Sequence, residues 1–168
     1  MGTFMASVAF RRSENWEAVK PEIEQLYQGV TGLVTNLDQD RSAYAIVSPY
    51  GDEGPILSEL VGPISRLTGG YAVMAICVDS DLNILDLYRD GELVERCGIG
   101  VCFEEFAEVD DFSEPNLENW KPLLLDPAQE AALQDAFFEE AVFAEENLRK
   151  LSALTGLPIF DDAMVFGE

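Results

Sequence analysis

The segment from Val78 to Glu92 decides the fold of this chain, and its sequence reads VDSDLNILDLYRDGE. Asp90-Gly91 predicts a two-residue type I′ hairpin turn. Asp79-Ser80-Asp81 has the composition of a second tight turn, whose side chains can accept backbone N–H bonds. The strand between the turns has a mostly buried face (Asn83, Leu85, Leu87) and a partly buried face (Leu82, Ile84, Asp86, Tyr88). The window therefore predicts two turns of a β-meander.

A calcium-binding loop is the competing interpretation of the same window. Asp79, Asp81 and Asn83 match positions 1, 3 and 5 of the EF-hand template, and Asp90 falls at position 12. The template needs glycine at position 6 for its sharp turn, and this chain has Ile84 there. The flanking residues are also typical of strands, whereas an EF-hand needs two amphipathic helices. These mismatches favour the meander.

Strand and helix patterns alternate along the rest of the chain. Residues 3–10, 32–37, 42–48 and 71–77 have the composition of strands, followed by 82–88 and 93–97. Helical spacing follows Ser13, Pro55 and Asp126. The order β-α-β-β-α-β-β-β-α predicts an α+β protein with a mainly antiparallel sheet and helices packed on one face. The length of 168 residues predicts that residues 1–168 form a single globular domain.

The last helical region starts at a well-defined signal. Asp126 is a predicted N-cap, and Pro127 suits the first helical turn. An apolar stripe continues to Leu151, and Gly156 predicts the end of the helix. The pattern is compatible with one helix to Thr155 or with two helices broken near Glu139.

The chain contains no histidine, and this excludes several kinds of chemistry. Ser-His and Cys-His nucleophiles cannot form, and neither can sites for zinc, copper or haem that depend on histidine ligands. The three cysteines Cys77, Cys97 and Cys102 lack CxxC spacing and are expected to be buried thiols. No cofactor is expected.

The location of the protein is inferred from its N-terminus and its hydropathy. The basic pair Arg11-Arg12 follows the apolar residues, which is the reverse of a secretory signal. No apolar run reaches the length of about 18 residues that a membrane span needs. We expect a cytoplasmic protein.

The net charge of −22 makes nucleic acids and anionic membranes poor partners and attracts a basic protein. The segment 97–148 holds fourteen acidic residues and a single base, Lys121. This acidic segment is either a docking surface or only a solvated, solubilising face. As a docking surface, it supplies the candidate partner-binding residues Glu104, Glu105, Glu108, Asp110, Asp111 and Glu114.

Asp86 is a carboxylate inside an otherwise apolar strand. It is expected to pair with Arg89 or Arg96 across the sheet, or to lie at an edge. If it is buried without a base, it becomes a candidate functional residue.

Three classes of function follow from these features. The leading hypothesis is a non-enzymatic module that binds a basic partner, similar in its physics to bacterial immunity or inhibitor proteins. The alternative is a carboxylate-dependent enzyme, with or without magnesium, that uses Asp79, Asp81, Asp86 and the cluster Glu104–Asp111. The third possibility is a subunit of a larger assembly, which an exposed apolar patch would indicate.

Overall fold

The computed structural model describes residues 2–100, 114–139 and 143–167. Its strands are β1 (Met5–Arg11), β2 (Val34–Thr35), β3 (Ala43–Ser48), β4 (Tyr71–Val78), β5 (Leu82–Arg89) and β6 (Glu92–Gly100). Its α-helices are α1 (Trp16–Leu26), α2 (Gly54–Thr68), α4 (Leu117–Trp120), α5 (Glu130–Phe138), α6 (Glu145–Thr155) and α7 (Asp162–Phe166). Two 3-10 turns, η1 (Lys121–Leu123) and η2 (Pro127–Gln129), precede α5. The predicted α+β class and the predicted element order are confirmed.

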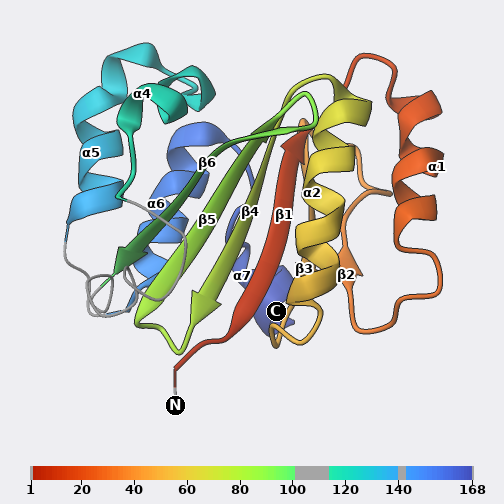
Figure 1. The fold of residues 1–168 in the computed structure, drawn as a ribbon, viewed down its shortest axis with the longest axis horizontal. Coiled ribbons are helices and arrows are strands. Elements are labelled where there is room, and N and C mark those ends of the chain that lie inside the picture. The colour runs from red at the N-terminus through yellow and green to blue at the C-terminus, as the bar shows by residue number, and fades with distance from the viewer. Residues whose placement is uncertain (1, 101–113, 140–142, 168) are drawn as a thin grey trace.

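The six strands form one sheet in the order β2-β3-β1-β4-β5-β6, and every neighbouring pair is antiparallel (Figure 1). β1 lies in the interior of the sheet, with Val8 opposite Ile46 of β3 on one side and Met74 of β4 on the other. β2 and β6 are the terminal strands. The antiparallel sheet was predicted correctly.

Helices cover both faces of the sheet, and this corrects the prediction that they pack on one face. Ala6, Val8 and Phe10 of β1 point to the face that α1 and α2 cover. Met5 and Ala9 alternate with them and point to the opposite face, where α5, α6 and α7 pack. Because the central strands are apolar on both sides, each face needs its own layer of helices to exclude water.

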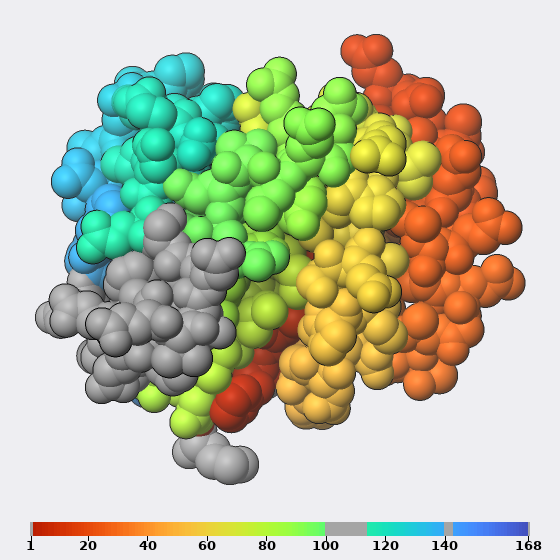
Figure 2. Space-filling model, in the orientation of Figure 1, coloured from red at the N-terminus to blue at the C-terminus, as the bar shows by residue number. Residues whose placement is uncertain are grey.

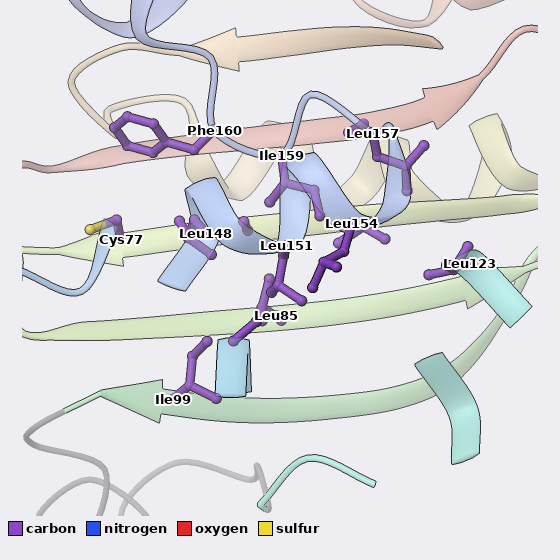
Figure 3. Packing of buried hydrophobic residues seen from close by; sticks show 14 of the residues in the cluster. Cys77, Leu85, Ile99, Leu123, Leu148, Leu151, Leu154, Leu157, Ile159 and Phe160 are labelled. Atoms are coloured by element: carbon purple, nitrogen blue, oxygen red, sulfur yellow. The ribbon is translucent and has the colours of Figure 1, made fainter. Parts of the chain in front are cut away.

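Leucines of α6 form the centre of the second core. Figure 3 shows Leu148, Leu151 and Leu154 lying over β4 and β5, near Leu85. Helical spacing places these three leucines on one face, so a single stripe can pack on the flat sheet. The segment after α6 adds further buried apolar side chains, Leu157, Ile159 and Phe160.

The meander predicted from the opening window is confirmed. Asp90 has φ 50° and Gly91 has φ 88°, as a type I′ turn requires at both central positions. The pair Arg89 and Glu92 closes this hairpin. Residues 79–81 form the other turn, between Val78 and Leu82. Two acidic turns therefore set the register of three adjacent strands.

The acidic helical region forms two helices, α5 and α6, so the alternative with a break near Glu139 is correct. Asp126 accepts a hydrogen bond from the Ala128 N–H at 3.0 Å and caps the turn before α5, as predicted. The structure adds α7, which is not among the predicted helices. Within the described residues, no helix is both long and apolar enough to cross a membrane.

On the face shown in Figure 2, side chains of α1 and α2 occupy the right half. Side chains of β5 and β6 reach the surface beside α2. Val94 and Arg96 of β6 are exposed accordingly. The cover that α1 and α2 give to this face of the sheet is therefore partial.

Candidate functional site

The predicted partner-binding run is described only at its end. Glu104, Glu105, Glu108, Asp110 and Asp111 lie outside the described residues. Glu114 is described and exposed, shortly before α4. The docking role of the run therefore stays a prediction.

Asp86 lies on β5 with its side chain on the face of α2, and only 6% of the residue is exposed. Arg96 stands directly opposite on β6. Its Nε donates to Oδ1 at 2.8 Å and its Nη2 donates to Oδ2 at 3.0 Å. This two-bond geometry is the strongest form of an arginine–carboxylate pair. Asp86 therefore pairs with one of the two predicted bases, so the condition that would make it a candidate functional residue is not met.

Asp79 and Asp81 lie apart from Asp86. Both belong to the turn before β5, whereas Asp86 is four residues into that strand, about 13 Å from its first residue. Asp79 Oδ1 accepts the Gly2 N–H at 2.9 Å and so binds the N-terminal segment. Within the described residues, no group of three or more carboxylate or thiol side chains is placed to hold a metal ion.

Ser80, in the same turn, connects three distant parts of the chain. Its N–H donates to the Thr3 carbonyl at 3.1 Å, and its Oγ accepts from the Thr3 N–H at 2.7 Å. Its carbonyl accepts from the Ala144 N–H, and its hydroxyl donates to Glu145 Oε1 at 3.1 Å. The turn therefore joins the N-terminal segment to the start of α6.

Glu145 is a buried carboxylate at the first residue of α6. It accepts hydrogen bonds from Ser80, from Thr3 Oγ1 at 3.4 Å and from Cys77 Sγ at 3.8 Å. No arginine or lysine of the described residues forms an ion pair with it. Glu145 lies in the first turn of α6, near the positive end of the helix dipole.

The cysteine beside Glu145 is a poor nucleophile. Burial, together with the nearby Glu145 charge, raises the pKa of Cys77 to about 12. A thiol with this pKa stays protonated at neutral pH, whereas the thiolate is the reactive form. Asn83 completes the cluster by donating from Nδ2 to the Ala144 carbonyl at 2.7 Å. This arrangement fits a structural junction better than a reactive centre.

A groove with a volume of about 490 Å³ runs along the β2 edge of the sheet. Three segments line it: residues 31–34 at β2, the loop between β3 and α2, and residues 164–167 of α7. In Figure 1 the C-terminal end lies beside the loop that precedes α2. Segments far apart in the sequence therefore meet at this terminal strand.

Exposed apolar side chains and unneutralised carboxylates share this groove. Tyr50 is 79% exposed, Phe166 is 52% exposed and Val34 is 38% exposed. Among the described residues of its lining, only Asp52 and Glu53 are charged, and neither forms an ion pair with a described base. The groove is thus both apolar and negative.

A second, larger hollow of about 670 Å³ has neutralised carboxylates instead. Asp161 lies 3.9 Å from Arg41, and Asp162 lies 2.7 Å from Arg149. A cationic ligand therefore meets less unpaired negative charge in this hollow than in the β2-edge groove.

Most bases of the protein are already engaged. Seven of the ten lie within 4.0 Å of a carboxylate of the described residues: Arg12, Lys20, Arg41, Arg96, Lys121, Arg149 and Lys150. Because these positive charges are locally compensated, the excess of carboxylates dominates the field that a partner meets.

Sequence reasoning identified neither Glu145 as a buried carboxylate nor Tyr50 and Phe166 as one surface. Tyr50 sits in a Pro-Tyr-Gly loop signal, and Asp161 followed by Gly167 marks a short capped helix. Both local signals can be read from the sequence. Only the structure shows that Tyr50 and Phe166 lie at the same groove.

No protein-family model matches this chain, and neither a curated protein nor a solved structure gives a match. The arguments about function therefore rest on the residues and the geometry of this chain.

Proposed function

We propose that this protein is a non-enzymatic binding module for a basic protein. The observation that carries the proposal is the uncompensated negative charge: the chain has a net charge of −22, and seven of its ten bases form ion pairs with described carboxylates. A field of one sign accelerates the encounter with a partner of the opposite sign and repels partners of like charge. Nucleic acids and anionic membranes are disfavoured on the same ground.

An inhibitor or immunity role suits this physics. An acidic protein can cover the positive active site of a basic enzyme, and the opposite charges speed the capture. The acidic run from Glu104 to Glu114 would supply long-range attraction, which acts mainly on the association rate.

Affinity capture from native lysate followed by mass spectrometry tests the proposal. A partner with a basic surface is expected, and it should be recovered again with the purified protein. A variant with Glu104→Gln, Glu105→Gln, Glu108→Gln, Asp110→Asn and Asp111→Asn should bind it with a slower association rate. If every reproducible partner is acidic or neutral, the proposal is wrong.

A carboxylate-dependent enzyme is the weaker alternative. It needs Asp79, Asp81 or Asp86 to converge with the Glu104–Asp111 cluster, and Asp86 is already paired with Arg96 and lies away from the turn that carries the other two. The Glu104–Asp111 cluster lies outside the described residues. A subunit of a larger assembly is a further possibility, which the exposed Leu93 and Val94 on the terminal strand β6 favour.

A further inference from the structure

The β2-edge groove gathers apolar surface in one place. Single exposed apolar residues are ordinary on protein surfaces, but contiguous patches mark interaction sites. Tyr50, Phe166 and Val34 come from three segments and line the same groove. Aromatic side chains in such positions are the common anchors of protein interfaces.

The loop that carries Tyr50 is held in place by its own hydrogen bonds. The Gly51 N–H donates to the Ser48 carbonyl at 3.1 Å, and the Glu53 N–H donates to Ser48 Oγ at 3.1 Å. Gly51 adopts φ 77°, which glycine permits at little cost. A partner therefore meets a pre-organised loop and loses less conformational entropy on binding.

The other wall is also fixed. Asp161 caps α7 by accepting from the N–H groups of Ala163 at 3.0 Å and Met164 at 3.4 Å. Met164 and Val165 are buried in the core. Phe166, the next residue, projects from a helix that is anchored on two sides.

The charge of the groove selects its occupant. Asp52 and Glu53 lie in the lining without any lysine or arginine. A second copy of this chain would bring another −22 charges and is disfavoured by repulsion. A cationic segment would satisfy both carboxylates, and a large apolar side chain beside its charge would cover Tyr50 and Phe166.

The position of the groove favours an extended segment. In the sheet that the described residues form, β2 is a terminal strand with a neighbour on one side only. A terminal strand offers backbone groups to which an extended peptide can add. The groove reaches this strand at Val34 and is also lined by the three residues before it, 31–33.

From these observations we infer that the β2-edge groove binds an extended segment of the basic partner, in which a lysine or arginine stands next to a large apolar residue. This inference rests on the proposed function. It adds the surface that binds the partner and the kind of side chains that this surface recognises.

The test is a titration of the 15N-labelled protein with a lysine-tryptophan-lysine-leucine-lysine peptide at low salt, followed by amide chemical shifts. Shifts are expected to cluster at residues 31–34, 50–53 and 164–167. A lysine-glycine-lysine-glycine-lysine peptide should bind at least about tenfold more weakly, because it lacks the apolar anchors. A glutamate-tryptophan-glutamate-leucine-glutamate peptide should not bind.

Paired variants locate the interaction. Tyr50→Ala with Phe166→Ala should weaken the peptide about tenfold or more, and Asp52→Asn with Glu53→Gln about threefold. The matched controls should stay within about twofold. For the apolar pair the control is Leu93→Ala with Val94→Ala on β6. For the charged pair the control is Glu59→Gln with Asp135→Asn. All four control residues are exposed and lie outside the groove. Amide spectra of each variant report whether it is folded.

The outcomes separate this inference from the proposed function. Shifts that cluster away from the groove, or equal losses in the control variants, overturn the inference while cationic binding stands. If neither cationic peptide binds and no basic partner is captured, the inference and the proposed function both fail. If a variant does not fold, the amide chemical shift changes of the wild-type protein still locate the surface that binds the peptide.

Discussion

Ser80 shows how much one residue in a tight turn can connect. Both it and Asp79 adopt positive φ values, 59° and 51°, which cost side-chain-bearing residues about 1 kcal/mol each. The hydrogen bonds of Ser80 to Thr3, Ala144 and Glu145 offset this cost. The strain in the acidic turn is therefore explained by tertiary connections, and a metal ion is not needed to account for it.

The pair between Asp86 and Arg96 should respond asymmetrically to truncation. Arg96→Ala leaves a buried carboxylate without its base and should lower the free energy of unfolding by about 2–3 kcal/mol. Asp86→Ala leaves Arg96, whose side chain is 41% exposed and can be hydrated. The free energy of unfolding is therefore expected to fall by only about 1 kcal/mol. Urea unfolding of both variants and of the double variant measures this. Equal losses in the two single variants would contradict the burial argument.

The Cys77 thiol predicts a loss of stability at alkaline pH. Burial raises its pKa from about 9.0 to about 12 in the folded protein. The unfolded thiol therefore ionises first, so the stabilising contribution is complete below pH 9 and is lost as the pH rises toward 12. When the pH is raised from 7.5 to 10, the thermal midpoint of the wild type should fall, and that of Cys77→Ala should fall by less. An equal fall in both proteins would refute this role of Cys77.

At the scale of elements, the β5–β6 hairpin depends on its glycine. Gly91 has φ 88°, and an added Cβ would lie 2.6 Å from Arg66 Nε. Gly91→Ala should therefore destabilise the protein by about 1–2 kcal/mol. Gly54→Ala is the matched control, because Gly54 begins α2 with open space around its Cβ position and no positive φ. Chemical denaturation compares them, and a Gly91 variant as stable as the control would contradict the turn assignment.

The order of elements could be predicted because local signals determine it. Asp90-Gly91 specifies a hairpin, and Asp126-Pro127 specifies a helical start, without reference to the rest of the chain. The face on which each helix packs depends on which strands become neighbours in the sheet. Leu148 and Leu151 show an apolar stripe in the sequence, but nothing in the stripe says which side of β4 it covers.

The candidate sites were harder to predict for the same reason. Asp86 was singled out because one strand contains both the carboxylate and its apolar context, and Arg96 follows within the same meander. Glu145 meets Ser80 and Thr3 only after the N-terminus and α6 are brought to one turn. The β2-edge groove likewise needs three segments that are distant in sequence.

At the scale of the whole molecule, the net charge of −22 opposes folding through self-repulsion. Added salt screens this repulsion, since the Debye length falls from about 30 Å at 0.01 M to about 3 Å at 1 M. We expect the thermal midpoint to rise between 10 mM and 500 mM sodium chloride, as measured by calorimetry. A midpoint that falls over this range would mean that specific ion pairs outweigh the repulsion.

The same charge underlies the proposed function, because most of the bases are held in ion pairs within the fold. A partner with a basic surface gains attraction on approach, and the β2-edge groove then offers apolar anchors for contact. Charge and groove contribute separately: the first acts on the association rate, and the second acts on the dissociation rate.

The measurement that tests this account most directly is the dissociation constant of the complex with the captured partner at 50 mM and 500 mM sodium chloride. We predict that the constant rises about tenfold or more at the higher salt, mainly through slower association. A dissociation constant that is the same at both salt concentrations would contradict the claim that the protein binds a basic partner through its acidic surface.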